Sequence, residues 1–529
     1  MRRPAFAFQS WFERAATRYA LSVLSGVLLA ACFPRFNLPG LVWVAPLPLL
    51  LALVHEPLLK RAYLLGALAG AVFLAGSVYW FAGVMENYGH VSAPGALIVM
   101  ALFLIVDSSY WGFFGLLMAW LARRSGALAL FVGPFLWVTM DLAQTYGYFG
   151  GFPWNLVGYA VPAGGLRQLA SIAGVYGLSF LALATAALAA AIVISGPTWR
   201  RRAALVFALW VVGLIVCNRL LAPPPPPLGN ELAILVQPNI PLNESAENWA
   251  PWKDPGPLDH LVSLTLDNLR QAQPGAGPAL IVWSENPAPF YFGRDPVFRN
   301  TMEKLARDAG ANLIVGSVNF EGGDTSRPLN SAVVLDPSGS VLLQYAKIHL
   351  VPFGEYVPVW LDHLVGKITS EAGNFVPGSN YAAAQGSQGA LGVFICYEEI
   401  FPQLVRRLAP RGPSVLVNIS DDAWYGDSSA SYQTMDMSRL RAVENHRWLL
   451  RATNDGITSV IDPYGRVLET LPRHEQIALA SHFDYEEQET FYHSHGDVFA
   501  GFCLAVAGVA VAARVRMGGR RGVSAGARG

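Results

Sequence analysis

The stretch ALGVFICYEEI, residues 390–400, places a cysteine where a buried strand turns into a helix. The apolar and small residues before Cys396 predict the strand, and the residues after it predict the start of the helix. A nucleophile on such a turn projects from the edge of a sheet with its side chain free to attack. This stretch therefore indicates a layered fold of strands and helices, with Cys396 as a candidate nucleophile.

Cys396 is the one cysteine between Pro223 and Asp497, and the other three stand in strongly apolar stretches. It has no disulfide partner in that region, and no Cys/His cluster with the spacing of a zinc site surrounds it. The simplest alternative is that Cys396 is a small buried hydrophobic residue, as most free cysteines are. The other three cysteines are Cys32, Cys217 and Cys503.

The composition is too apolar for an ordinary soluble enzyme. Of the 529 residues, 53% are hydrophobic and 14% are charged, and the mean hydropathy is +0.35. Typical soluble domains are about one quarter charged residues. The formal net charge is zero and no basic stripe is interleaved with aromatic residues, so nucleic acid is not expected as a partner.

Long apolar stretches predict a polytopic membrane protein. A helix needs about 20 apolar residues to span a bilayer. The first, second and last stretches are short by that count, but their interiors carry no charge. Seven stretches precede Pro223, and an eighth follows a region of mixed character that predicts a soluble domain. The eight stretches cover residues 18–33, 40–55, 62–83, 94–122, 126–144, 167–195, 203–221 and 498–513.

Basic residues alternate between successive loops and predict the orientation. The loops on one side, together with both termini, hold sixteen Arg and Lys residues, whereas the short loops on the other side hold only Arg35 and Arg167. Both termini are therefore expected in the cytoplasm, and the soluble domain at the periplasmic face of a bacterial inner membrane. The sixteen are Arg2, Arg3, Arg14, Arg18, Lys60, Arg61, Arg123, Arg124, Arg200, Arg201, Arg202, Arg514, Arg516, Arg520, Arg521 and Arg528.

The first stretch also fits a secretory signal, since Leu29-Ala30-Ala31-Cys32 matches a lipoprotein processing box. The alternative is an uncleaved first helix with Cys32 packed at its outer end. Cleavage would leave the orientation unchanged, so the processing of Cys32 stays open.

Five prolines from Pro223 to Pro227 follow the seventh stretch. They favour a stiff polyproline spacer of roughly 15 Å, at about 3.1 Å per residue, and a simple helix stop is the alternative. The expected organisation is seven transmembrane helices in 1–222, a proline-rich linker in 223–229, a periplasmic catalytic domain in 230–490, an eighth transmembrane helix in 497–514 and a basic cytoplasmic tail in 515–529.

Strands and helices alternate in the soluble region, which is typical of a layered α/β domain. Asp295 caps one expected helix, which has Pro296 at its first position and Gly310 past its end. Expected strands lie at 231–236, 279–283, 312–316, 331–336, 341–346, 393–396, 415–419, 449–454 and 457–462, and expected helices at 258–269, 296–309, from Cys396 through Leu408, and at 432–447.

Three reactive or charged residues stand at or just beyond the ends of expected strands: Glu285, Lys347 and Cys396. Strands in such folds end at a common edge, where ligands bind. Together the three side chains fit acyl transfer, because a thiolate attacks an acyl carbon, a carboxylate carries the proton and an ammonium stabilises the oxyanion. Taken singly, Glu285 fits a loop carboxylate and Lys347 a solvated strand end, so only their joint placement favours catalysis.

Glu285 in WSENP, Lys347 in KIHLVPFGEYVP and Cys396 in ICYE resemble the Glu-Lys-Cys triad of the nitrilase, or carbon–nitrogen hydrolase, superfamily. The apolar stretches and the long motif that begins at Lys347 narrow this to a resemblance to the apolipoprotein N-acyltransferase family, over essentially the whole chain. Further family-like segments are residues 151–154, 158–159, 174–180, 236–241, 422–426, 439–445 and 451–454.

The resemblance implies eight membrane spans and a nitrilase-like αββα domain, which together form an acyltransferase. It implies that the thiolate takes an acyl chain from the sn-1 ester of a phospholipid, with phosphatidylethanolamine the expected donor, and holds it as a thioester. The α-amino group of the diacylglyceryl-cysteine of an apolipoprotein then accepts the chain, in the last step of lipoprotein maturation. A monomer without metal or cofactor is expected.

The resemblance also implies roles for individual residues. Glu285 is the expected base, Lys347 and backbone donors near Tyr397 the expected oxyanion partners, and Cys396 the nucleophile. Glu355, Tyr397 and Glu398 are expected to support them. Core packing is the alternative for each aromatic residue expected to contact substrate, namely Trp249, Trp154, Phe290 and Tyr291, with Trp252 and Trp360 as further candidates.

The chain departs from the family pattern at several positions. Ser284 stands where the family has Pro, Asp421 where it often has Asn, and Thr434 where a His is common. Asp141 and Gln144 stand where Glu and Arg are usual. These departures affect lipid positioning and leave the reaction class unchanged.

Two rival functions remain open. A membrane-tethered amidase would hydrolyse with the same triad, although a simple tether needs only one helix. A transporter or scaffold with a degenerate hydrolase domain is disfavoured because the triad is complete and the spans hold few ionisable residues. His493 and His495 form a pair near the last span, but no third metal ligand is apparent.

Overall fold

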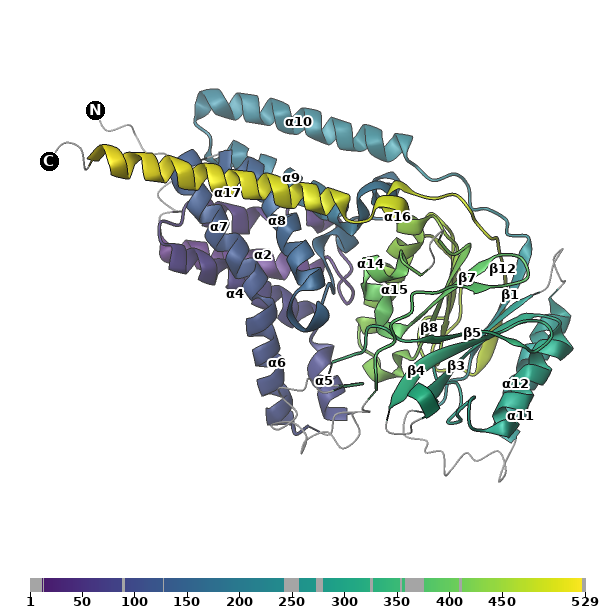
Figure 1. Cartoon of the computed structure of the whole chain (residues 1–529). Coiled ribbons are helices and arrows are strands. Elements are labelled where there is room, and N and C mark those ends of the chain that lie inside the picture. The colour runs from purple at the N-terminus through teal and green to yellow at the C-terminus, as the bar shows by residue number, and fades with distance from the viewer. Residues whose placement is uncertain are drawn as a thin grey trace. The chain divides into compact units, whose positions relative to one another are not determined.

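The computed structural model describes residues 12, 14–87, 91–126, 128–241, 256–272, 279–323, 327–352, 354–356, 375–408 and 412–525. The chain divides into two compact units (Figure 1). The first unit comprises residues 1–82, 97–223 and 495–529, and the second comprises residues 83–96 and 224–494.

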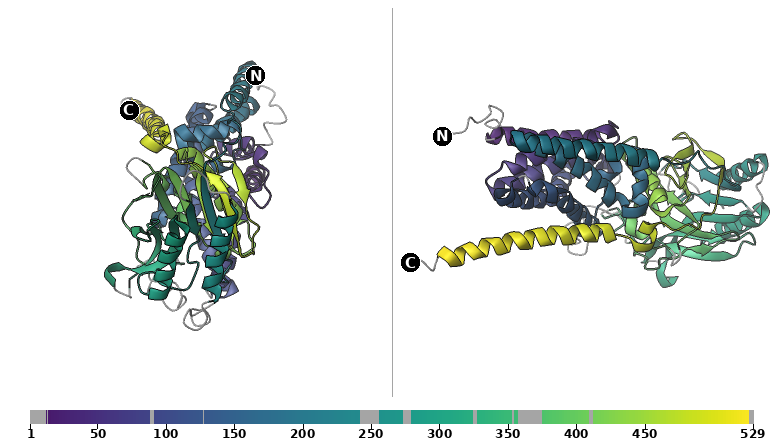
Figure 2. Two further views of the ribbon diagram at one scale, coloured as in Figure 1. Left: turned by 90° about the vertical axis from the view of Figure 1, so that its right-hand side faces the viewer. Right: turned by 90° about the horizontal axis from the view of Figure 1, so that it is seen from above.

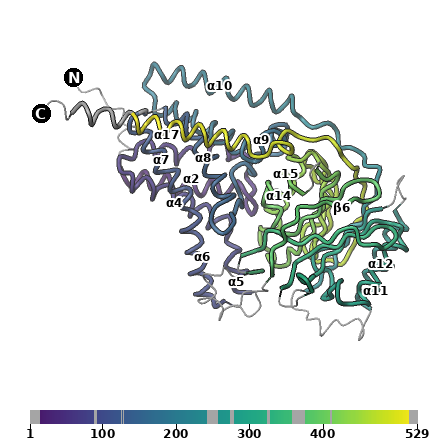
Figure 3. The backbone as a smooth tube through the Cα atoms, viewed as in Figure 1, coloured from purple at the N-terminus to yellow at the C-terminus, as the bar shows by residue number. Residues whose placement is uncertain are grey.

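The first unit is made of helices. Helix α4 packs against α2 and α7, while α8 packs against α7, α9 and α17. Helix α10 packs along α9 (Figure 3). It has no buried residue, and its exposed apolar side chains include Leu205, Leu209 and Val212. The bounds are α2 Ala15–Ala31, α3 Leu47–Val54, α4 Leu59–Ser77, α5 Trp80–Asn87, α6 Ala93–Asp107, α7 Ser109–Ser125, α8 Leu128–Tyr146, α9 Ala170–Ile194, α10 Pro197–Leu220 and α17 Val498–Ala525.

Six helical segments among the described residues are long and apolar enough to cross a membrane. The first two expected spans instead form shorter apolar helices, Ala15–Ala31 and Pro39–Val54, while the last expected span qualifies. Eight spans therefore remain a prediction. The six segments are Leu59–Ser77, Ala93–Arg124, Leu128–Tyr146, Gly165–Ile194, Pro197–Leu220 and Val498–Arg516.

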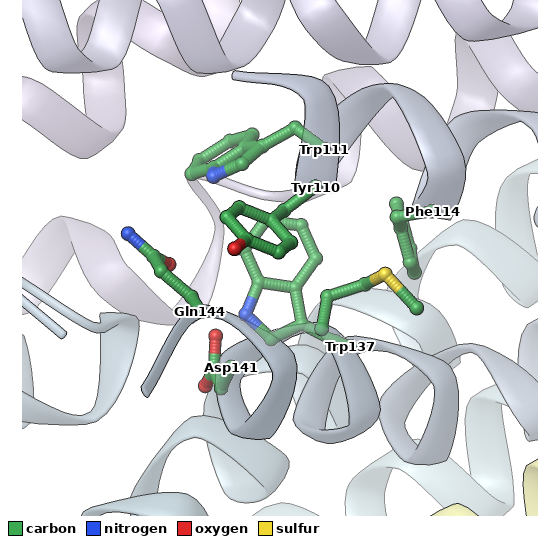
Figure 4. Close-up of a pocket in the computed structure, with 7 residues that line it drawn as sticks. Tyr110, Trp111, Phe114, Trp137, Asp141 and Gln144 are labelled. Atoms are coloured by element: carbon green, nitrogen blue, oxygen red, sulfur yellow. The ribbon is translucent and has the colours of Figure 1, made fainter. Parts of the chain in front are cut away.

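Polar side chains are buried inside the first unit. Arg18 donates from Nε to Glu56 Oε2 at 2.8 Å, and both side chains are almost fully buried. Gln144 donates to Asp107 Oδ2 at 3.0 Å. Gln144 and Asp141, two positions that depart from the family pattern, line a pocket with room for about one water molecule. Its other lining residues are Tyr110, Trp111, Phe114, Trp137 and Met140 (Figure 4).

The second unit contains two six-stranded sheets. The first has the strand order β12-β1-β2-β3-β4-β5 and the second the order β11-β10-β9-β8-β7-β6. The strands are β1 Glu231–Gln237, β2 Leu280–Trp283, β3 Asn312–Phe320, β4 Pro328–Leu335, β5 Val341–Ala346, β6 Ala384–Gln385, β7 Ala390–Ile395, β8 Val415–Ser420, β9 Leu449–Thr453, β10 Ser459–Ile461, β11 Val467–Thr470 and β12 Ile477–Phe483.

Each sheet has three parallel strands at its centre. Strands β1, β2 and β3 run parallel in the first sheet, and β7, β8 and β9 in the second. Parallel strands that are buried on both faces usually have continuous apolar sequences. The sequences of β1, β2, β7 and β8 are mostly apolar, and nearly all their residues are buried. The flanking strands pair antiparallel, as in the hairpin of β4 and β5.

Helices of this unit pack on both sheets. Helix α11 (Gly256–Gln271) contacts β1 and β12, and α12 (Pro296–Ala309) contacts β3, whereas α15 (Ala430–Asn445) contacts β9 (Figures 1 and 2). A buried apolar cluster between α11, α12 and the first sheet includes Trp283, Phe290 and Phe298.

Helix α12 begins and ends at the residues that the capping signals in the sequence predicted. Asp295 accepts hydrogen bonds from the backbone N–H groups of Val297 and Phe298, which satisfies two donors that a helix start leaves unpaired. Gly310 takes φ +60°, a left-handed conformation that ends the helix at little steric cost.

The helix expected to run from Cys396 through Leu408 was wrong in extent. A 3₁₀ turn covers Cys396–Ile400, and the helix α14 that follows is confined to Pro402–Val405. Proline disfavours the helical conformation in the residue before it, and Phe401 is extended at φ −97° and ψ 98°. Strands β6, β11 and β12 were not expected. Strand β6 has two residues and β11 has four, one of them Glu469, whereas β12 has seven residues and no Asp, Glu, Lys or Arg, so its apolar residues 477–480 were overlooked.

Candidate active site

The three residues predicted to form the triad follow three different strands. Glu285 stands two residues after β2, Lys347 directly follows β5, and Cys396 directly follows β7. Strands β2 and β5 belong to one sheet and β7 to the other. All three residues are nearly buried, with exposed fractions of 5%, 1% and 7% respectively. The site therefore draws its acid–base and ammonium groups from one sheet and its thiol from the second.

Cys396 sits at a strained turn. Its φ is +48°, in the left-handed region that residues with a Cβ rarely adopt, while Ile395 before it is still an extended strand residue. Such strain persists only where the surrounding structure holds it, and it is frequent at functional sites. The turn redirects the chain at the end of β7, as predicted for a nucleophile.

Glu398 holds this turn in place. Its carboxylate accepts the backbone N–H of Ile395 at 2.7 Å, and it also accepts the backbone N–H groups of Ile348 and His349 at 2.7 and 3.2 Å. The hydroxyl of Tyr345 donates to both carboxylate oxygens at 2.9 Å. Burial raises the pKa of Glu398 to about 7. This one side chain thus connects the segment after β5 to the segment after β7.

Lys347 lies between two carboxylates. Its Nζ is 2.9 Å from Glu355 Oε1 and 3.7 Å from Glu285 Oε1. Glu355 is fixed in turn, because its other oxygen accepts the backbone N–H of Val351 at 2.7 Å. The side-chain amide of Asn330, in β4, donates to Glu285 Oε1 at 2.7 Å and to Glu355 Oε1 at 2.6 Å. Glu355 therefore stands beside Lys347, and its supporting role stays a prediction.

The electrostatics keep the lysine charged and make the glutamate a stronger base. Burial by itself would lower the pKa of Lys347, but the carboxylates of Glu355 and Glu285 raise it above its ordinary value. Burial also raises the pKa of Glu285, with Glu355 adding to the rise and Lys347 opposing it. A carboxylate with a raised pKa accepts a proton more readily, which suits general-base chemistry.

Several polar residues of this site were missed by sequence reasoning. The backbone N–H of Asp421 donates to Glu285 Oε2 at 2.9 Å, and Asn330 holds the other oxygen. Ser420 and Asp422 lie on either side of Asp421, and both are fully buried. The available signal was the occurrence of polar residues at or next to apolar strand runs, as for Asn330 just before residues 331–335.

The thiol of Cys396 is embedded among these groups. Its pKa is raised well above the ordinary value, first by burial and then by the charges of Glu285 and Asp422. Lys347 and a hydrogen bond with Ser420 act in the opposite direction. The resting sulfur is therefore a neutral thiol that needs a base to become a nucleophile.

The other predicted site residues lie in varied environments. Tyr397 is buried beside Phe401, with ring centroids 5.3 Å apart. Phe290 is buried and packs against Phe298 in the apolar cluster, whereas Tyr291 is 44% exposed. Their substrate contacts stay predictions, and the placement of Phe290 favours the core alternative.

Trp154 belongs to the first unit. It is fully buried and stacks on Phe152, with ring centroids 5.7 Å apart. Trp249, like Trp252 and Trp360, lies outside the described residues.

In the described part of the chain, no group of three or more His, Cys, Asp or Glu side chains could hold a metal ion. His493 is buried, and its Nδ1 lies 2.9 Å from Asn445 Oδ1.

Comparison with protein families finds two matches in this chain. Residues 25–188 match the model of the apolipoprotein N-acyltransferase N-terminal domain, and residues 235–483 match the carbon-nitrogen hydrolase model. The two matched ranges correspond to the helical part before residue 223 and to the two-sheet part.

Two relatives align with this chain over almost their whole length. An apolipoprotein N-acyltransferase of Geobacter metallireducens is 38% identical over 515 residues, which cover 94% of this chain and 95% of that protein. One of Methylococcus capsulatus is 32% identical over 511 residues, covering 94% and 96%. Among solved structures, a carbon-nitrogen hydrolase from Helicobacter pylori G27 is 17% identical with a TM-score of 0.35, covering 47% of this chain and 88% of that one.

Proposed function

The chain belongs to the apolipoprotein N-acyltransferase family, and on that premise we propose that it transfers an acyl chain from the sn-1 position of a phospholipid to the α-amino group of the diacylglyceryl-cysteine of apolipoproteins. It is an acyltransferase with a carbon-nitrogen hydrolase domain. The observation that carries the proposal is the ammonium of Lys347 lying 3.7 Å from Glu285, in a site where the charges of both act on the buried thiol of Cys396.

In the first step, Glu285 takes the proton of the Cys396 thiol and the thiolate attacks the sn-1 ester carbonyl. The ammonium of Lys347 stabilises the oxyanion that forms. When the tetrahedral intermediate collapses, the C–O bond breaks and the lysophospholipid alkoxide takes the proton from Glu285. The acyl chain is left as a thioester on the sulfur.

In the second step, the α-amino group of the acceptor attacks the thioester carbonyl and loses a proton to Glu285. The C–S bond then breaks, the amide forms, and the thiolate recovers the proton. Both substrates are lipids, so a site supplied from the membrane keeps water from competing with the amine. Glu355, Tyr397 and Glu398 support the triad in this scheme. Contact of Trp249, Trp154, Phe290 and Tyr291 with acyl chains stays a prediction, with core packing as the alternative for each.

The proposal extends to location and organisation. The protein is a bacterial membrane protein, and the asymmetry of basic residues supports placing both termini in the cytoplasm and the catalytic domain in the periplasm. We include the eight spans, an αββα order of layers, and the domain bounds 1–222, 223–229, 230–490, 497–514 and 515–529. A monomer with phosphatidylethanolamine as donor completes the scheme.

The test uses the full-length protein in phosphatidylethanolamine vesicles with a labelled sn-1 acyl chain. Label should appear on Cys396 as a hydroxylamine-sensitive thioester and should be absent from Cys396→Ala. A diacylglyceryl peptide with a free amino terminus should then receive the label as an amide. Release of free fatty acid in place of amide would point to an amidase, and absence of the thioester from the native protein would refute the mechanism.

A cellular measurement tests the same activity independently. Mass analysis of a lipoprotein amino terminus should find the N-acyl group in cells that contain this protein and not in cells depleted of it. A normal triacylated terminus in the depleted cells would contradict the proposed function.

A further inference from the structure

Ser420 ends strand β8 beside the nucleophile turn. Ile395 pairs with Ile419 in the parallel register of β7 and β8, so Cys396 and Ser420 leave the two strands at neighbouring positions. Ser420 is fully buried, and a side-chain hydrogen bond with it lowers the pKa of the Cys396 thiol. A hydroxyl next to the reacting sulfur is able to donate a hydrogen bond to a thiolate.

The same hydroxyl has a second acceptor. Ser420 Oγ donates to Asp422 Oδ1 at 2.8 Å, and Asp422 is fully buried. A serine hydroxyl carries one proton, so it donates to either the carboxylate or the sulfur at a given moment. The Ser420 hydroxyl donates to the Asp422 carboxylate or to the Cys396 sulfur according to which of the two carries the stronger negative charge.

Asp422 cannot follow the serine, because Arg451 holds it from the other side. The guanidinium donates to both carboxylate oxygens at 3.0 Å, and Arg451 is itself fully buried. Its Nη2 also lies 3.3 Å from Glu399 Oε1, in the nucleophile turn. This bidentate ion pair between Arg451 and Asp422 fixes the carboxylate in one orientation.

We propose that Ser420 is a further catalytic residue, whose hydroxyl donates to Asp422 while Cys396 is a thiol and turns to donate to the sulfur when the thiolate forms. The inference rests on the proposed function, in which Cys396 is the nucleophile. The proton of the thiol goes to Glu285, and the proton of Ser420 stays on its oxygen and only changes acceptor. Asp422 Oδ1 keeps its hydrogen bond from Arg451 when the serine turns away, so Asp422 and Arg451 act as positioning residues.

The charges around the sulfur give Ser420 and Asp422 opposite effects. Glu285 after β2 and Lys347 after β5 face the thiol from one sheet, while Asp422 and the phenol of Tyr425 face it from the segment after β8. Burial, Glu285 and Asp422 raise the pKa of Cys396, whereas Lys347 and the hydrogen bond with Ser420 lower it. Removing the hydroxyl and removing the carboxylate charge should therefore shift thiol ionisation in opposite directions.

The experiment measures how fast iodoacetamide alkylates Cys396 in the full-length protein in detergent, from pH 6 to pH 11, by quantifying the alkylated peptide. Ser420→Ala should move the inflection to higher pH by about one unit, which slows alkylation about tenfold at pH values below it. Asp422→Asn should move the inflection to lower pH. Ser420→Thr keeps the hydroxyl and should stay within about threefold of the native rate.

The matched control is Ser459→Ala, which removes another fully buried hydroxyl of the same sheet whose partners are Ile457 and Met435. Its profile should be native. An unchanged profile for Ser420→Ala, or equal profiles for Ser420→Ala and Ser420→Thr, would overturn the proposal even if Asp422→Asn fails to fold. Alkylation needs no acyl donor, so failure of the proposed acyl transfer would leave this result unaffected.

Discussion

The side-chain amide of Asn330, in β4, donates to Glu285 Oε1 at 2.7 Å, although β3 separates β4 from β2, the strand that Glu285 follows. The same amide nitrogen lies 2.6 Å from Glu355 Oε1, so one residue aligns both carboxylates around the ammonium of Lys347. Because the hydrogen bond from Asn330 favours the charged form of Glu285, it counteracts part of the effect of burial on that carboxyl. Asn330 thus influences the basicity of the proposed base.

Asn330→Ala should move the acid limb of the pH profile of thioester formation to higher pH. The hydrogen bond lowers the pKa of Glu285, so its loss raises that pKa, and the base is then protonated up to a higher pH. We expect a shift of about one pH unit and a rate about tenfold lower on the acid side. Asn312→Ala, which removes a buried amide bonded to Ser387 in another part of the sheet, should leave the limb in place.

Lys347→Met should abolish thioester formation and also destabilise the fold. Without the ammonium, Glu285 and Glu355 face each other as uncompensated buried charges, and removing one partner of a buried ion pair costs about 3–5 kcal/mol. The measurement is urea unfolding in detergent alongside labelling by the acyl donor.

The double variant Lys347→Met with Glu355→Gln separates the two effects. It removes one positive and one negative charge, so much of the stability should return while activity does not. A double variant as unstable as the single one would contradict the ion-pair explanation.

Glu398→Gln should flatten the pH dependence of stability. The folded protein holds a proton on Glu398 up to a pKa of about 7, whereas the unfolded chain loses it near 4.5. Between these values unfolding releases a proton, so the free energy of unfolding falls as pH rises, by an amount on the order of 3 kcal/mol. Glutamine carries no titratable proton, which removes this contribution.

The readout is the urea midpoint measured from pH 4.5 to pH 8. The native protein should lose stability across this range more steeply than Glu398→Gln. Glu469→Gln, at an exposed position of β11, should keep the native slope. Equal slopes for native protein and Glu398→Gln would show that Glu398 does not titrate in this window.

Gly316→Ala should impair catalysis through the backbone of the base. A Cβ at this position of β3 would lie 2.6 Å from the backbone oxygen of Ser284 and 2.8 Å from the Cα of Glu285. Contacts this short force the Glu285 segment to move, and displacements of about 1 Å cost roughly 100-fold in rate. Gly293→Ala meets only the side-chain oxygen of Asn319, at 3.3 Å, and should retain activity. Native activity of Gly316→Ala would mean that Glu285 tolerates displacement.

Most elements of the second unit could be predicted because their signals are local. Apolar runs marked β1, β2, β3, β7 and β8, and Asp295 and Gly310 marked the two ends of α12. Strand β12 was not predicted although it begins with the apolar run 477–480, and its place beside β1 depends on a partner more than 200 residues away. Apolar content identified the first two helices of the other unit, and the sequence already showed that both stretches are short for a membrane span.

The chain by itself determined which residues could react, because a lone cysteine at a strand end and the motifs around Glu285 and Lys347 are local features of the sequence. Only the tertiary structure decided what surrounds them. Two sheets, paired through contacts far apart in the chain, bring Asn330, Glu355 and Asp421 to the carboxylate, and Ser420 and Asp422 to the sulfur. Burial and charge act over a few ångströms in space and not along the sequence, so basicity and nucleophilicity arise only once the chain is folded.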